Sequence, residues 1–156
     1  MKIRTDFVTN SSSSSFILAF TDEDSIKQEV LDGLEGRDAY YFTRIWEDVM
    51  KAKRLSVDEA IDIIAEDSWD ADQEVISKKF GHGYYGKEAW DYRDTQEYKD
   101  ALRAEMSETI EDFKRRIGDK SVIVEVEYED HTNDGCILEH EVMPDHPATV
   151  RWISNH

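Results

Sequence analysis

Alternating and clustered apolar residues indicate two strands near the N-terminus. Residues 2–8 alternate between apolar and polar side chains, and residues 16–20 form an apolar run rich in β-forming types, so we expect both to be strands. The serine run Ser11–Ser15 lies between them. Because serine hydroxyls bond to the local backbone and favour turns, we expect this run to be the loop that joins the two strands.

The middle of the chain predicts helices. Apolar side chains recur there at three- and four-residue spacing over about residues 21–36, 38–54, 56–79 and 95–117. The segment GHGYYG, residues 81–86, is expected to be a loop because of its three glycines. The capping residues that we expect are Thr21, Ser56 and Asp94 at the N-terminal ends, and Gly36 and Gly118 at the C-terminal ends.

Towards the C-terminus the pattern returns to a period of two. Residues 122–128 and 136–142 alternate, and Asn133–Gly135 lies between them, with Gly135 suited to the left-handed position of a three-residue loop. These features predict an antiparallel hairpin. A last strand is expected at about residues 149–154.

Together these elements predict a single α+β domain over residues 1–156. We expect a mostly antiparallel sheet of about four to five strands, two N-terminal and three C-terminal, packed against about four helices. Residues 16–20 and 122–128 should be neighbouring strands, because both are apolar enough to need burial. The length of 156 residues, 39% of them hydrophobic, suits one core.

Charge narrows the classes of function. The chain carries 36 acidic and 19 basic side chains, a formal net charge of −17. A surface this negative repels nucleic acid and anionic membranes and accelerates encounters with basic partners. We therefore expect a basic protein as the partner, and no direct binding to nucleic acid or to a membrane. The sequence carries no indication of the oligomeric state.

Most of this charge lies in two segments. Residues 56–77 and residues 121–150 each hold eight acidic residues and no Lys or Arg. In the first segment, four acids at four-residue spacing would form a ladder with rungs about 6 Å apart on one helix. In the second, the expected hairpin would place two Glu–Glu pairs directly opposite each other. The ladder is Asp58, Asp62, Glu66 and Asp70, and the pairs are Glu127 with Glu141 and Glu129 with Glu139.

Like charges at these spacings are unfavourable, by a few tenths of a kcal/mol per pair on a helix, and no basic residue within either segment relieves them. Two interpretations are open. The acidic rows are a solvated surface, or they imitate the phosphates of a nucleic acid and enter a Lys/Arg groove of a partner. A calcium site is not indicated, because the calcium-loop pattern is absent.

Histidines and tyrosines are the other candidates for chemistry, since no catalytic motif is specific enough to name a reaction. His82 lies in GHGYYG beside Tyr84 and Tyr85, which we expect to pack or to contact a partner, because tyrosine is favoured at interfaces. His131 and His140 lack the spacing of metal ligands. We therefore expect no metal and no cofactor. A small enzyme or metal-binding protein that uses the His82, His131 and His140 region is the alternative.

We expect a cytoplasmic protein. The serine run interrupts the apolar N-terminal stretch and acidic residues follow it, which argues against a secretion signal. No apolar run approaches the roughly 18 residues of a transmembrane helix. Cys136 is the single cysteine, which excludes an intramolecular disulfide and fits a reducing compartment.

The segment KIRTDFVTNSSSSSF resembles the opening of a group of bacterial and mobile-element proteins that begin with a nearly identical string. The resemblance covers residues 2–18 only. It implies a bacterial or phage origin, and therefore a bacterial host cell as the location. No function is attached to that group, so the resemblance assigns no residue a role.

These observations favour an acidic, non-enzymatic binding protein. The concrete expectation is an inhibitor from a phage or mobile element that mimics nucleic acid and occupies the basic groove of a host defence nuclease, such as a CRISPR effector. The ladder, the two Glu–Glu pairs and the tyrosines Tyr84 and Tyr85 would contact the partner. A further alternative is a housekeeping interaction module whose charge serves only solubility.

Overall fold

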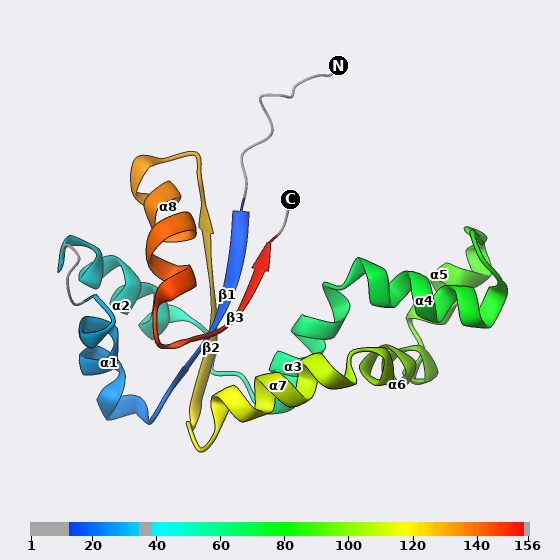
Figure 1. Ribbon diagram of the computed structural model, residues 1–156, viewed down its shortest axis with the longest axis horizontal. Coiled ribbons are helices and arrows are strands. Elements are labelled where there is room, and N and C mark those ends of the chain that lie inside the picture. Colours follow the sequence, from blue (N-terminus) through cyan, green and yellow to red (C-terminus); the bar gives the residue numbers. More distant parts are fainter. Residues whose placement is uncertain (1–12, 35–38, 155–156) are drawn as a thin grey trace. The chain divides into compact units, whose positions relative to one another are not determined.

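The computed structural model describes residues 13–34 and 39–154, which form two compact units (Figure 1). The first, here called the sheet unit, holds the described residues up to Ser56 and from Ile117 onward. The second, here called the helical unit, is Val57–Arg116. Compactness alone does not decide whether a unit folds independently, so the expected single domain stays a prediction.

The sheet unit is built on three antiparallel strands in the order β2-β1-β3. The central strand β1 (Ser13–Phe20) pairs with β2 (Val122–Glu129) on one side and with β3 (Thr149–Ser154) on the other. Phe16 lies opposite Val126 in this register. The predicted strand at 149–154 is confirmed, and so is the predicted pairing of 16–20 with 122–128.

Helices cover one face of this sheet (Figure 1). They are α1 (Ile26–Asp32), α2 (Phe42–Lys51) and α8 (Asn133–Ile137), and a 3₁₀ turn, Ala39–Tyr41, precedes α2. Their apolar side chains bury the alternate residues of β1 and β2, which face the helices because side chains alternate along a strand. The core contains Phe16, Leu18, Phe20, Ile26, Val30, Ile45, Val49, Val124, Val126, Leu138 and Val142.

The serine run was predicted to be a loop, and for its described part this is wrong. Ser13, Ser14 and Ser15 belong to β1, and Ser14 and Ser15 are buried. Ser14 is held there by a partner, because its hydroxyl donates a hydrogen bond of 2.9 Å to the Glu139 carboxylate. Ser11, Ser12 and the predicted strand at 2–8 lie outside the described residues.

The predicted hairpin is also wrong, because residues 136–142 are helical. Thr132 caps α8 by accepting a hydrogen bond from the Gly135 amide at 3.0 Å. The helix continues as a π-helical turn, Leu138–Val142, and then as a 3₁₀ turn, Met143–Asp145. The strand β2 therefore pairs with β1 and not with 136–142.

The burial of this segment explains why the alternating pattern was misleading. The buried residues are Gly135, Leu138, Glu139 and Val142, which recur at helical spacing. Counting Glu139 as an outward polar residue produced the strand pattern. Gly135 is needed here for close approach and not for a left-handed conformation, since a Cβ would lie 2.0 Å from the Glu129 carbonyl oxygen.

The helical unit has its own core and five helices. The sequence predicted fewer and longer helices in this part of the chain. The described core contains Ala65, Val75, Ile76, Tyr98 and Leu102. The helices are α3 (Val57–Glu66), α4 (Trp69–Phe80), α5 (Lys87–Arg93), α6 (Gln96–Glu105) and α7 (Ser107–Ile117).

Local capping explains where the predicted helices divide. The expected helix at 56–79 ends at Glu66, and a new one starts because the Ser68 hydroxyl accepts from the Ala71 amide at 3.2 Å. The expected helix at 95–117 divides at Met106. The helix α5 was not predicted. The loop at 81–86 was predicted correctly, and Gly81 and Gly83 have positive φ there.

Two of the expected N-caps are each displaced by one residue. Asp22, and not Thr21, caps the turn before α1, and Thr95, and not Asp94, caps α6. Gly33 follows α1, whereas the expected C-cap Gly36 lies outside the described residues. Gly118 follows α7 with a positive φ of 58°, as expected of a glycine after a helix.

The fold is α+β, but the predicted numbers of strands and helices are wrong. The described residues contain eight α-helices and a sheet of three antiparallel strands, in place of about four helices and four to five strands. Two breaks within predicted helices and the helical segment after β2 account for most of the difference.

Candidate binding pocket

The helical unit contains a pocket of about 490 Å³ at which large aromatic side chains are exposed to solvent. Trp69 begins α4, Tyr85 lies in the loop at 81–86, and Trp90 lies on α5. Their exposed fractions are 70%, 76% and 65%. Exposed aromatic surface gathered in one place marks a binding site more often than isolated apolar residues do.

A hydrogen-bonded network lies on the polar side of this pocket. The Arg93 guanidinium donates to both Asp72 oxygens, at 2.7 and 2.9 Å, and the Tyr98 hydroxyl donates to Asp72 at 2.6 Å. The Arg93 guanidinium lowers the pKa of the Asp72 carboxyl. Burial, and after it the hydrogen bond to Asp72, raises the pKa of Tyr98. The network links α4, α5 and α6 at the pocket.

The charge of the lining is negative. Glu66 and Asp67, at the end of α3, line the pocket together with Asp72. Arg93 is the basic residue of the lining, and its two hydrogen bonds to Asp72 match that carboxylate. With three acidic side chains and one basic side chain, the lining carries an excess of acidic residues, which favours a cationic ligand.

Tyr84 is held within the pocket lining by local contacts, whereas Tyr85 is largely exposed to solvent. The Tyr84 ring stacks on Phe80 with centroids 5.1 Å apart, and its hydroxyl donates to Glu88. Gly86 makes room for this ring, since a Cβ there would lie 2.1 Å from the Tyr84 hydroxyl oxygen. Gly86 thus leaves the space that the Tyr84 side chain occupies.

The acidic ladder does not run along one helix. Asp58, Asp62 and Glu66 lie on α3, but Asp70 lies on the next helix, α4, after the turn that ends α3. Arg103 of α6 reaches this surface and donates to Asp62 at 2.7 Å and to Asp58 at 3.4 Å. A base from outside the acidic segment therefore pairs with two of the ladder residues.

The acidic rows of the predicted hairpin do not form either. Glu127 and Glu129 lie on β2 opposite Ser15 and Ser13 of β1. Glu141 lies on the π-helical turn and is exposed. Glu139 is fully buried, so its carboxylate is not part of the protein surface.

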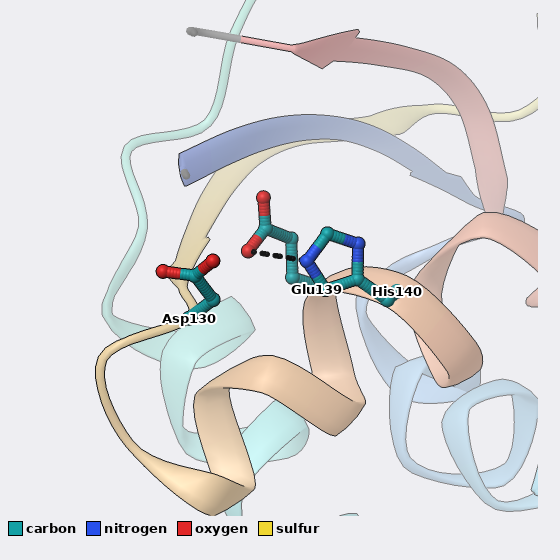
Figure 2. A group of neighbouring side chains, drawn as sticks. All are labelled: Asp130, Glu139 and His140. Atoms are coloured by element: carbon teal, nitrogen blue, oxygen red, sulfur yellow. Dashed lines mark ion pairs between the residues drawn. The ribbon is translucent and has the colours of Figure 1, made fainter. Parts of the chain in front are cut away.

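Glu139 belongs to a small group with Asp130 and His140 (Figure 2). One potential ligand atom from each residue lies within 4.8 Å of the others, and carboxylates with imidazole are donors that divalent metals accept. Both Glu139 oxygens already have partners, however: the Ser14 hydroxyl at 2.9 Å and His140 Nε2 at 3.3 Å. We therefore assign Glu139 a structural role, as a buried side chain of the π-helical turn whose two oxygens both have partners.

The histidines of the alternative hypothesis belong to two different units. His82 lies in the exposed loop of the helical unit, whereas His131 and His140 belong to the sheet unit. His131 lies 2.9 Å from a Glu129 oxygen, and His140 contacts Glu139.

Sequence reasoning identified part of this pocket and missed its most exposed residues. Glu66, Tyr84 and Tyr85 were candidates, and all three line the pocket. Trp69 and Trp90 were not among those candidates. No local pattern distinguishes them from Trp46, which also precedes an acidic residue but is only partly exposed.

No family model matches this chain, and comparisons with curated proteins and with solved structures found no match. Within the described residues, every helix is too short or too polar to cross a membrane.

Proposed function

We propose that this protein is an acidic, non-enzymatic binding protein that recognises a basic segment of a partner protein with the pocket of its helical unit. The observation that carries the proposal is the exposure of Trp69, Tyr85 and Trp90 at one pocket. Trp and Tyr are the side chains that most often dominate the energy of protein interfaces.

Charge supports a basic partner. The net charge of −17 attracts cationic surfaces from a distance and raises the rate of encounter. Glu66 and Asp67 then place negative charge at the aromatic side chains themselves. Long-range attraction and local contact would therefore select the same class of partner.

The finer proposal concerns the identity of the partner. A basic groove that normally holds nucleic acid offers the Lys and Arg side chains that such a pocket would bind. An inhibitor from a phage or mobile element, acting in the bacterial cytoplasm on a defence nuclease, is the concrete form. Mimicry would then rest on the acidic and aromatic surface of the helical unit, since the rows of the sheet unit do not form.

A short fluorescein-labelled arginine-rich peptide tests the coarser proposal by fluorescence anisotropy. The test variant is Trp69→Ala with Tyr85→Ala, which removes two exposed rings and leaves the net charge unchanged. Tyr40→Ala is the matched control, because Tyr40 is 63% exposed but lies in the sheet unit. We expect the test variant to lose about tenfold or more in affinity, as hot-spot residues do, and the control to bind as the parent does.

Equal affinities of the parent and the test variant at every salt concentration would reject the pocket as the binding surface. A titration of the captured complex with duplex DNA or RNA addresses the finer proposal once a natural partner is known. Competition by nucleic acid supports mimicry, whereas a ternary complex contradicts it.

A further inference from the structure

The pocket of the helical unit already contains one guanidinium, that of Arg93, which contacts both an aromatic ring and a carboxylate. The Arg93 Cζ atom lies 4.6 Å from the centroid of the Trp90 ring. The same guanidinium donates two hydrogen bonds to Asp72. One planar cation is thus held by an aromatic face and a carboxylate together, which is the arrangement that suits arginine better than lysine.

The remaining groups of the pocket repeat this combination of ring and carboxylate. Trp69 and Tyr85 expose 70% and 76% of their surface, so their rings are accessible to a ligand. Glu66 and Asp67 supply carboxylates to the same lining. A volume of about 490 Å³ lies within the range of small-ligand sites and exceeds what one side chain head group fills.

We infer that the pocket takes an arginine side chain of the partner, together with the residues that flank it, by contact with Trp69 and Tyr85 and with the carboxylates of Glu66 and Asp67. This inference rests on the proposed function and names the chemistry that it recognises. Arginine is preferred to lysine because the guanidinium is planar and more weakly hydrated, and because it offers paired donors to a carboxylate. An anionic ligand is disfavoured by the excess of carboxylates in the lining.

The four tryptophans provide the readout. Trp69 and Trp90 line the pocket, whereas Trp46 and Trp152 lie in the sheet unit. Their indole N–H signals are assigned in the full chain with single Trp→Phe variants and followed by NMR. The probes are Nα-acetyl-arginine amide, Nα-acetyl-lysine amide and Nα-acetyl-citrulline amide, which share a backbone and differ in charge and planarity.

We expect the arginine amide to shift the Trp69 and Trp90 signals saturably and to bind about fivefold more tightly than the lysine amide, the size of a modest cation–π preference. The citrulline amide should cause no saturable shift, because it keeps the shape but lacks the charge. The signals of Trp46 and Trp152 should not move. In the variant Glu66→Gln with Asp67→Asn, binding of the arginine amide should weaken.

Two results would overturn the inference. If citrulline amide binds as well as arginine amide, the pocket does not select for positive charge. If lysine amide binds as well as arginine amide or better, the pocket does not select for the guanidinium group. The anisotropy experiment separates these failures from failure of the proposed function. If pocket-dependent binding of the arginine-rich peptide persists while either result is found, the proposed function stands but the pocket does not select a charged guanidinium.

Discussion

At the scale of single residues, Ser14 explains part of the serine run. Its hydroxyl donates to Glu139, and both side chains are completely buried. A carboxylate in this position needs donors, because a buried charged group without hydrogen bonds is strongly destabilising. Ser14 is therefore a structural residue of β1. The polar side chains of the serine run led to the prediction of a loop where the structure has a strand.

The substitution Ser14→Ala should lower the free energy of unfolding by about 1–3 kcal/mol, the usual penalty for leaving a buried acceptor with one donor fewer. Urea denaturation followed by circular dichroism measures this. Ser13→Ala is the matched control, since Ser13 lies in the same strand but is only half-buried. A loss no greater than that of the control would contradict the structural role of the Ser14–Glu139 hydrogen bond.

His146 is a second buried polar residue whose contacts define its protonation state. Nδ1 accepts a hydrogen bond from the Ala148 amide at 3.0 Å, so the neutral ring carries its proton on Nε2, which lies 3.2 Å from the Val30 carbonyl oxygen. Gly33 leaves space for the ring, since a Cβ there would lie 2.1 Å from Nε2. Burial lowers the pKa of His146.

This lowered pKa predicts a specific pH dependence of stability. As the pH falls below the unfolded pKa of about 6.5, the unfolded chain binds a proton that the folded imidazole does not, so stability decreases until the folded pKa is reached. Above about pH 6.5 the contribution is complete. Urea unfolding of the parent and of His146→Gln between pH 5 and 8 isolates it. The parent should lose more stability on acidification than the variant, and parallel profiles would refute this.

At the scale of elements, α3 is held to α6 through charge as well as packing. Arg103 pairs with Asp58 and Asp62, which are like charges four residues apart on α3. The pairs are largely solvent-exposed, so their contribution to stability is small. Their effect is to relieve the repulsion that the isolated acidic segment would have.

The substitution Arg103→Met should therefore destabilise the protein by about 0.5–1 kcal/mol at low ionic strength and by less at high salt. Thermal unfolding at two salt concentrations measures the difference. Adding Asp62→Asn to Arg103→Met should recover part of the loss, because it removes one of the two unrelieved carboxylates. Recovery that is absent at low salt would show that Arg103 acts through packing of its side chain alone.

Residues 133–142 show why sequence patterns predicted some elements and not others. The short apolar run at residues 16–20 is rich in β-forming residues and was predicted to be a strand. Its pairing with residues 122–128 was also predicted. Between Gly135 and Val142 the apolar positions fit both periods, and the choice depended on Glu139. That residue is buried because a serine from β1 satisfies it, a contact between residues 125 positions apart that no local pattern contains.

The candidate pocket was less predictable than the fold for the same reason. Asp72, Arg93 and Tyr98 come from three helices, and their network exists only once these helices pack. The sequence did indicate the chemical character of the site through its acidic segment and the tyrosines of GHGYYG. It could not indicate that Trp69 and Trp90 are exposed, because their exposure depends on where α4 and α5 begin.

At the scale of the whole molecule, the net charge of −17 and the aromatic pocket should affect different steps of binding. Charge at a distance from the contact mainly sets the association rate, and the groups in contact mainly set the dissociation rate. Glu127 and Glu141 are exposed and do not belong to the pocket lining, so they test the first role.

Stopped-flow kinetics with the arginine-rich peptide separate the two roles. The variant Glu127→Lys with Glu141→Lys should slow association by about two- to threefold at low salt and leave dissociation unchanged, and the difference from the parent should vanish as salt screens charges beyond about 8 Å. The variant Trp69→Ala with Tyr85→Ala should accelerate dissociation and associate at a rate near that of the parent. If charge reversal in the sheet unit instead accelerated dissociation, the peptide would contact the sheet unit directly, and the pocket could not be its sole binding surface.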